Sequence, residues 1–233
     1  MRFREVAPGL YRASRKVINI YAIVKGGETT LFDTGEPSFA PAILRALAPL
    51  PPLRHILLTH VHYDHVGSAA RIAAQTNAAV YAHPAEAALL ASGRWRRPCT
   101  ASPTLLGRVM KRLVADRFPD QVDPVIADPV GDVKLDIAGG LRVIALPGHS
   151  AGQIGFGVPL GDGRTAWIVG DVIMNLLSPR EPILYEDRAE GLTSIGRIAQ
   201  TVNNSDLICP GHGSPIPVSP VVQNTLRTLS HEG

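Results

Sequence analysis

Hydrophobic and polar positions along the chain predict strands and helices in alternation. Short apolar or alternating runs bounded by turn residues predict β-strands at positions 9–12, 18–24, 29–32, 55–59, 79–82, 133–135, 141–146, 154–158, 165–169 and 207–209. Apolar residues at helical spacing predict helices at 41–50, 69–75, 84–90, 187–201 and 220–229. This alternation is typical of βαβ units and predicts an α/β fold. His83 precedes Pro84 at a helix start, where a capping or packing histidine is more common than a metal ligand.

The stretch from 93 to 132 interrupts this alternation. It holds five prolines and one amphipathic piece, with apolar residues at helical spacing at Leu105, Leu106, Val109, Met110, Leu113 and Val114. Four interpretations are open: a lid or pocket wall over a site, a self-association face that makes a homodimer, a patch on membrane headgroups, or a solvated charged face over a packed stripe. We expect a single domain, residues 1–233, with a basic lid-like insertion at about 93–132.

The net charge of +3 is unevenly distributed along the chain. Residues 93–118 hold seven arginines and lysines against the single acid Asp116, a balance of +6, so the rest of the chain carries about −3. Basic character confined to one segment does not indicate a general nucleic-acid binder, and we expect no nucleic acid among the partners.

Composition indicates which broad class of protein this is. The chain is 45% hydrophobic and 18% charged, which is typical of globular proteins. Cys99 and Cys209 are too isolated to indicate a disulfide framework or a thiolate metal site. The first residues lack the apolar core of a signal peptide, and no stretch approaches the ~20 apolar residues of a membrane span. We therefore expect a cytoplasmic protein without stable membrane insertion.

The highest density of reactive side chains follows the predicted strand at 55–59. His60, His62, Asp64 and His65 occur within six positions, and neither helix propensity nor core packing explains them. Imidazole nitrogens and carboxylate oxygens are ligands of divalent ions such as zinc. His60 and His62, two residues apart at a strand end, would point the same way, while Asp64 and His65 follow on the next turn.

Ligand-type residues beside glycine end three further predicted strands. They are His149 after Gly148, Asp171 after Gly170, and His212 between two glycines. Glycine lets the backbone turn sharply, so that the neighbouring side chain can project into a shared pocket. Each pair is a weak signal alone, but four strand ends with zinc-type side chains together predict a metal site. Asp33, before Thr34 and Gly35, is either part of this pattern or a turn residue.

The ordered set HxHxDH, GH, GD and GHG, with an earlier DTG, resembles the metallo-β-lactamase superfamily from about Val6 to about Leu229. The resemblance implies a four-layer αββα sandwich with a metal site along one edge. By position it assigns His60, His62 and His149 to a first zinc ion, Asp64, His65 and His212 to a second, and Asp171 to both. It also implies that Asp33 orients a ligand by a hydrogen bond.

The resemblance implies two Zn²⁺ ions, with iron or manganese as alternatives. Two such ions share a water and lower its pKa from 15.7 towards about 7, so hydroxide is present at neutral pH. Hydroxide attacks a carbonyl or phosphoryl centre while a metal stabilises the developing anion. The catalytic candidates are Asp64 and Asp33, and a protonated Asp64 that donates to the leaving group after the attack is a hypothesis.

Departures from known branches narrow the family. Zinc β-lactamases generally carry Cys or Ser at the bridging position, so Asp171 argues against a dedicated β-lactamase. Diiron flavoproteins of this fold have Glu where His62 stands, and the best-known lactonases have a Tyr shortly after the bridging Asp, where residues 172–175 have none. The chain ends some twenty residues after His212, without the longer helical part with which glyoxalase II enzymes bind glutathione.

The remaining group is that of glyoxalase-II-like hydrolases. We predict a binuclear zinc metallohydrolase that cleaves an ester, thioester or lactone, with a small-molecule substrate that is anionic or acyl-bearing. The basic segment beside an apolar stripe motivates this substrate class. The alternatives are a mononuclear iron dioxygenase resembling the persulfide dioxygenases of the same fold, and a promiscuous β-lactam hydrolase.

Overall fold

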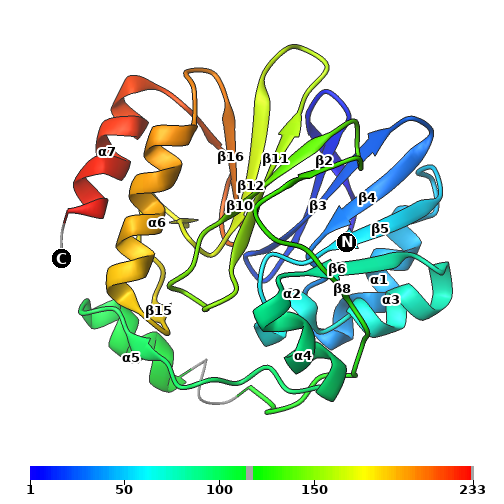
Figure 1. Ribbon diagram of the computed structural model, residues 1–233, viewed down its shortest axis with the longest axis horizontal. Coiled ribbons are helices and arrows are strands. Elements are labelled where there is room, and N and C mark those ends of the chain that lie inside the picture. The colour runs from blue at the N-terminus through cyan, green and yellow to red at the C-terminus, as the bar shows by residue number, and fades with distance from the viewer. Residues whose placement is uncertain (114–117, 232–233) are drawn as a thin grey trace.

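The computed structural model describes residues 1–113 and 118–231, and two β-sheets lie at its centre (Figure 1). The first sheet has the order β1 (Arg4–Ala7), β2 (Leu10–Arg15), β3 (Ile18–Lys25), β4 (Glu28–Phe32), β5 (Leu53–Leu57), β6 (Ala79–Ala82) and β8 (Asp128–Pro129). Strands β1 to β4 pair in antiparallel fashion, whereas β4, β5, β6 and β8 run parallel. The parallel strands deliver their carboxyl ends to one edge of the sheet.

The second sheet has the order β17 (Ile216–Pro217), β16 (Leu207–Pro210), β12 (Thr165–Gly170), β11 (Ile154–Pro159), β10 (Leu141–Ala145) and β9 (Lys134–Leu135). Its pairs are antiparallel except for β12 and β16, which run parallel. Two short ribbons pair β13 (Met174–Asn175) with β14 (Pro179–Arg180), and β15 (Leu184–Tyr185) with β7 (Thr100–Ala101).

Helices cover the outer faces of both sheets. Their bounds are η1 (Pro37–Phe39), α1 (Ala40–Leu47), α2 (Tyr63–Val66), α3 (Ala69–Thr76), α4 (Pro84–Ser92), α5 (Leu105–Leu113), α6 (Arg188–Thr201) and α7 (Pro220–Ser230). In Figure 1, α6 and α7 lie on one side of the sheets and α1 and α3 on the other. His83 caps α4 by accepting a hydrogen bond from the amide of Ala85, as the sequence predicted.

Side chains that point alternately to the two faces of each strand fill three hydrophobic cores between these four layers. In β3, Ile20 belongs to the core beneath α1 and α3, while Tyr21 belongs to the core between the sheets. In β12, Ile168 faces the same central core, while Trp167 packs with α6 and α7. Successive strand residues point to opposite faces, so both sheets are apolar on both sides. The fold is therefore the predicted αββα sandwich, and every predicted strand and helix has a counterpart in it.

The segment 93–132 is tied to the sandwich at several points. Trp95, Val122 and Ala127 are buried in the core beneath α1 and α3, and β7 pairs with β15. In α5, Leu105 and Val109 are exposed. From the predicted amphipathic piece, Val114 and the side chains of Leu106, Met110 and Leu113 lie outside the described residues, as do Asp116 and Arg117 from the charge balance. The division into one domain with a lid-like insertion stays a prediction.

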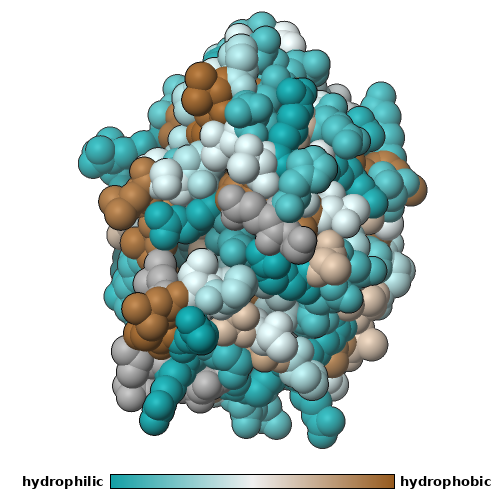
Figure 2. Space-filling view, turned by 90° about the vertical axis from the view of Figure 1, so that its left-hand side faces the viewer, coloured by the Kyte–Doolittle hydropathy of each residue, from teal (hydrophilic) through white to brown (hydrophobic). Residues whose placement is uncertain are grey.

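Apolar groups are scattered on the face that carries α6 and α7. Figure 2 shows hydrophobic residues there in small groups separated by hydrophilic ones. One exposed member is Val221 of α7. Among the described helices, none is long and apolar enough to cross a bilayer.

Candidate metal centre

Strand ends bring the seven predicted ligands to one edge of the sandwich. His60 and His62 follow β5, Asp64 and His65 lie in the short helix α2, and His149 follows β10. Asp171 directly follows β12, and His212 follows β16. The sequence placed Asp64 and His65 on a turn, whereas the structure has a helical turn there. Every one of these residues is at least half-buried, and they gather from positions 152 residues apart.

His60, His62 and His149 form one group, which we name the first triad. One donor atom from each lies within 4.8 Å of those of the others. His149 Nδ1 donates to the carbonyl of Leu184 at 2.7 Å, and His60 Nδ1 lies 3.0 Å from Thr59 Oγ1. Both rings thereby turn Nε2 towards the centre of the triad, where these two nitrogens are buried without a hydrogen-bond partner.

Asp64, His65 and His212 form a second group, the second triad, with the same spacing limit of 4.8 Å. His212 Nε2 lies 3.3 Å from Asp64 Oδ2. Glycine at position 211 is required here, because a Cβ would come within 2.3 Å of Asp171 Oδ1 and 2.6 Å of the His65 ring. The glycine therefore lets the His212 loop approach the other ligands.

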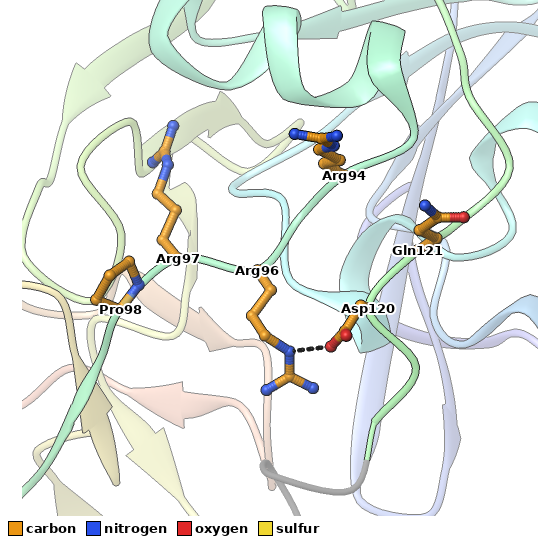
Figure 3. Close-up of a pocket in the computed structure, with 6 residues that line it drawn as sticks. All are labelled: Arg94, Arg96, Arg97, Pro98, Asp120 and Gln121. Atoms are coloured by element: carbon orange, nitrogen blue, oxygen red, sulfur yellow. Dashed lines mark hydrogen bonds and ion pairs between the residues drawn. The ribbon is translucent and has the colours of Figure 1, made fainter.

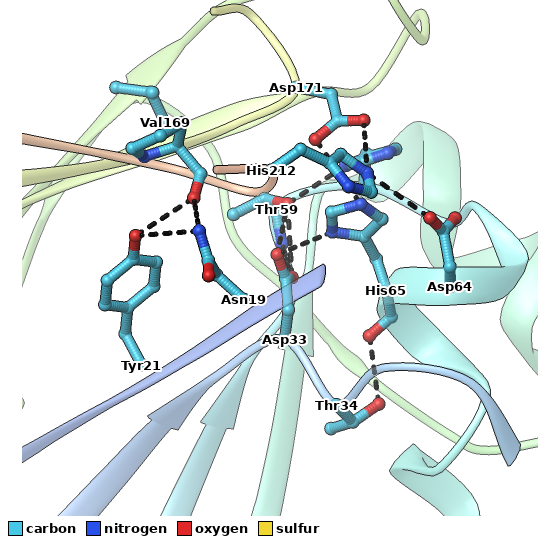
Figure 4. A network of polar contacts seen from close by, with 12 residues as sticks. Asn19, Tyr21, Asp33, Thr34, Thr59, Asp64, His65, Val169, Asp171 and His212 are labelled. Carbon is cyan, nitrogen blue, oxygen red and sulfur yellow. Dashed lines mark hydrogen bonds and ion pairs between the residues drawn. The ribbon is translucent and has the colours of Figure 1, made fainter. Parts of the chain in front are cut away.

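Asp171 lies between the two triads. Its Oδ2 is 3.2 Å from His212 Nε2 and 3.6 Å from His149 Nε2, and its Oδ1 is 3.4 Å from His65 Nε2 (Figure 4). One carboxylate thus contacts ligands of both groups, which is the arrangement that a bridging ligand needs.

Asp33 orients a histidine of each triad from behind (Figure 4). Its Oδ2 accepts from His65 Nδ1 at 2.9 Å, and the Thr59 hydroxyl donates to the same carboxylate. Because the only hydroxyl hydrogen of Thr59 points to Asp33, its oxygen accepts from His60 Nδ1–H. Asp33 itself adopts a left-handed backbone with φ of 56°. Short polar residues tolerate that region, and backbone strain collects at functional sites.

The two triads differ in protonation. Burial and the neighbouring histidine rings hold the pKa of His60 and of His62 well below the usual value. Burial would also lower the pKa of His212, but Asp171 and Asp64 raise it to about 10. Burial would raise the pKa of Asp64, but His65 and His212 lower it to about 2. The first triad is therefore neutral, and the second is held by ion pairs.

The donor set fits divalent metal ions. Buried polar atoms normally have partners, so the orphaned Nε2 atoms of His60 and His149 require an explanation. A positive ion among neutral imidazoles and carboxylates supplies one, because each ring is fixed by its other nitrogen in the tautomer that ligation needs. Three His and Asp groupings of this geometry occur among the described residues, all at this edge.

A family model for the metallo-beta-lactamase superfamily matches residues 14–225. The chain belongs to the metallo-beta-lactamase superfamily. This confirms the resemblance that the sequence motifs suggested, and the fold agrees with it. A solved superfamily structure, the subclass B3 metallo-beta-lactamase BJP-1 of Bradyrhizobium japonicum, superposes with a TM-score of 0.73 at 20% identity. The superposition covers 100% of this chain and 92% of that one.

Two superfamily relatives carry functional names. A probable metallo-hydrolase of Bacillus subtilis, YqgX, is 27% identical over 214 residues, which make up 91% of this chain and 90% of the relative. A hydroxyacylglutathione hydrolase of Cereibacter sphaeroides is 31% identical over 187 residues, 80% of this chain but 58% of the relative. An uncharacterised protein of Mycobacterium tuberculosis is 30% identical over 165 residues, 68% of each chain. The coarse function is therefore that of a superfamily metallo-hydrolase with a His/Asp cluster.

A pocket of about 440 Å³ opens onto this superfamily centre. Ligands of both triads line it, together with residues of the segment 93–132. Trp95 packs edge-on to His62 at 5.8 Å between ring centroids, and Phe118 stacks on Tyr63 at 5.1 Å. The segment therefore forms one wall of the pocket, as one of the four interpretations expected. The rim of the pocket also carries Val17 and Leu176, both exposed.

Sequence reasoning missed the residues that hold the ligand loops. Asn19 donates through Nδ2 to the carbonyls of Pro210 and Gly213 at 2.9 and 2.6 Å, and Tyr21 donates to Pro210 at 3.0 Å. Both lie in β3 and fix the loop that carries His212. The sequence pattern predicted the strand that holds both residues, but no motif signals hydrogen bonds across about 190 residues.

Proposed function

We propose that this chain is a dinuclear zinc hydrolase of carboxylic esters, thioesters or lactones. The observation that supports it most directly is Asp171, whose carboxylate contacts His149 of the first triad and both His65 and His212 of the second. In this proposal each triad holds one ion and Asp171 is shared. A mononuclear iron site that uses two His and one Asp would leave the complete second triad unexplained.

The residues divide the work of the reaction. Two divalent ions bound there would lower the pKa of a water molecule towards about 7 and would polarise the scissile carbonyl. Asp64, with a pKa of about 2, is ionised at neutral pH and lies beside His212. It is placed to accept a proton from the nucleophile and to return it to the leaving group, so the resting form is a base. That Asp64, protonated after the attack, donates to the leaving group stays a prediction.

The charges near the pocket favour an acyl group over a strongly anionic one. Lys16 pairs with Glu36 at 2.9 Å, and Arg96 pairs with Asp120 at 2.5 Å. Arg97 pairs with Glu86 at 3.0 Å. Since these cations already have carboxylate partners, the apolar side chains remain the main recognition surface. They are Val17, Ile18, Trp95, Phe118, Met174, Leu176, Ile183 and Leu184.

The bond class is supported by the relatives. One is named a hydroxyacylglutathione hydrolase, a name that denotes cleavage of an acyl thioester. We extend only the bond class to this chain, because the match spans 58% of that relative.

Metal reconstitution with a substrate panel tests the proposal. Protein stripped with a chelator is reloaded with zinc or iron and assayed on p-nitrophenyl butyrate, an S-acyl thioester, a lactone, a β-lactam and a phosphodiester. We expect ester or thioester turnover that rises to a plateau at two zinc ions per chain. Phosphodiester cleavage alone would contradict the bond class, and oxygen uptake at one iron per chain would support the dioxygenase alternative instead.

A further inference from the structure

Glu86 of α4 is a fully buried carboxylate that the chemistry above does not use. Its Oε2 accepts from the amide of Val61, the residue between His60 and His62, at 3.2 Å. Its Oε1 accepts from the Ser150 hydroxyl at 3.0 Å and from the Gly152 amide at 2.8 Å. One side chain therefore ties together the two loops that supply all three histidines of the first triad.

The loop after His149 is shaped around this carboxylate. A Cβ at position 152 would lie 2.4 Å from Glu86 Cγ and 2.6 Å from its Oε1, so only glycine allows the contact. A second carboxylate, Glu186, holds the same loop from the other side. It accepts from the amide of Ala151 at 2.9 Å, and its own amide donates to the carbonyl of His149 at 3.3 Å.

Arg97 lies between the two carboxylates. Its Nη1 is 3.0 Å from Glu86 and 3.4 Å from Glu186, and its Nη2 donates to the carbonyl of Ala85 at 2.5 Å. Figure 3 shows it directed away from Arg96, which reaches Asp120 instead. The Arg97 side chain is only 21% exposed. The segment 93–132 thus sends one cation inward to the metal centre.

We infer that Glu86, Arg97 and Glu186 form a brace that positions the first triad, with Arg97 as the cation that holds its two carboxylates in place. Removing one partner of a buried ion pair leaves an uncompensated charge, which is far more costly than losing a surface pair. Without Arg97, Glu86 and Glu186 would repel each other or draw in water, and the loops that they hold would loosen. The inference rests on the proposed dinuclear site.

The brace has no symmetrical counterpart in the described surroundings of the second triad, which Asp33, Asn19 and Tyr21 support instead. Loss of Arg97 should therefore weaken one metal position and spare the other. Removing an outer partner of a metal ligand costs about 10–100-fold in metal affinity. We expect a loss in that range for the first triad only.

Single-site backgrounds make this measurable with Co²⁺ alone. His212→Ala leaves the first triad intact, and His149→Ala leaves the second. In each background, Arg97→Met is compared with Arg94→Met, a matched loss of an arginine three residues away on the exposed side of the segment. Co²⁺ affinity is measured by competition with a chelating indicator, and the visible Co²⁺ spectrum reports ligand geometry.

We expect Arg97→Met to weaken Co²⁺ binding about 10–100-fold in the His212→Ala background and to alter the spectrum. Binding in the His149→Ala background, and both bindings with Arg94→Met, should be unchanged. Adding Glu186→Gln to Arg97→Met should recover part of the affinity, because it removes the uncompensated charge. A mere packing defect would not respond to this second change.

Unchanged Co²⁺ affinity and spectrum for Arg97→Met in the His212→Ala background would overturn the brace. Should that variant not fold, Arg97→Lys, which keeps the charge but loses the paired geometry, must still weaken the first triad. Failure of the proposed function is separate, because parent protein that binds no metal at all would refute the dinuclear site before any variant is compared.

Discussion

The first and second triads use similar ligands in opposite electrostatic settings. Around the first triad, the Nδ1 atoms of His60 and His149 contact neutral oxygens of Thr59 and Leu184, the rings pack on one another, and the Asp171 carboxylate lies 3.6 Å from His149 Nε2. Around the second, each histidine contacts a carboxylate: Asp33 and Asp171 face His65, and Asp171 and Asp64 face His212. The difference lies in the surrounding charges.

This contrast predicts how the centre is loaded. Metal ligation requires neutral imidazole, so the first triad is ready at neutral pH, while the second must release protons as it binds. The first position should fill first and keep its metal to lower pH. The second position should be the one that pH controls.

The largest expected effect comes from removing the residue that the triads share. Asp171→Asn keeps the shape but loses the charge that contacts both groups. Loss of an outer partner costs about 10–100-fold in metal affinity, so loss of a shared ligand should exceed about 100-fold for the pair. Metal analysis after dialysis, with turnover of the best ester substrate, measures this. Retention of two tightly held ions would show that Asp171 is not a bridge.

Substitutions of Asp33 and of Thr59, which hold ligand histidines by hydrogen bonds, should affect the two triads differently. Asp33→Asn leaves an amide facing the donors of His65 and Thr59, and should cost about 10–100-fold in Co²⁺ affinity in the His149→Ala background. Thr59→Val removes only the hydroxyl that orients His60, so its effect should be smaller and confined to the His212→Ala background. Equal effects of both changes on both triads would contradict the contrast.

The pH dependence of binding tests the protonation difference directly. His212, with a pKa of about 10, carries a proton at pH 7 that metal must displace. Affinity of the second triad should therefore fall about tenfold per pH unit for each displaced proton as pH drops. Between pH 9 and pH 7, the first triad should change far less. Titration calorimetry in buffers of different ionisation enthalpy counts the released protons.

The raised pKa of His212 affects the stability of the metal-free protein in the opposite direction, because there a higher pH is unfavourable. Because the pKa of His212 is raised above its ordinary 6.5, its ion pairs stabilise the protein fully below that pH. That contribution is lost as pH rises towards about 10. Chelated protein should therefore lose thermal stability across that interval, relative to His212→Gln measured in parallel.

The ligands could be predicted from sequence because they lie at or shortly after the ends of four strands. The apolar run 56–58 and the glycines beside His149, Asp171 and His212 mark where strands stop, and such ends meet at one edge. Glu86 could not be predicted, since it is a single acid in an alanine-rich helix whose partners lie 25, 64 and 66 residues away. The burial of Glu86 depends on tertiary packing, which the spacing of apolar residues along the helix does not reveal.

The segment 93–132 also makes tertiary contacts that its sequence did not predict. Its charge of +6 favoured a lid or a solvated face, yet Arg97 points inward and Trp95 is buried in the core beneath α1 and α3. Charge counts cannot tell an arginine that meets solvent from one that meets buried carboxylates. The edge strand β1 was also missed, because three of its four residues are exposed and lack an apolar pattern.

The smallest expected effect lies at the pocket rim, outside both triads. Arg15 pairs with Ile18, which leaves Lys16 and Val17 as a two-residue hairpin loop with φ of 52° and 65°. A β-branched residue in the left-handed region costs about 1–2 kcal/mol, and hairpins of this length favour Asn-Gly. Val17 is also 57% exposed beside the pocket. Local stability explains neither property, which indicates a role in substrate contact.

Val17→Gly should therefore stabilise the protein by about 0.5–1 kcal/mol, after the entropy cost of glycine, and leave both Co²⁺ affinities unchanged. The KM for a long-chain acyl ester should rise by about fivefold, the equivalent of roughly 1 kcal/mol of lost apolar contact, while kcat holds. Val17→Ala is the matched control, because it trims the side chain but keeps a Cβ in the left-handed region. It should raise KM similarly without the gain in thermal stability. If Val17→Gly were more stable but bound short and long acyl esters as before, the rim would be a strained turn without a part in recognition.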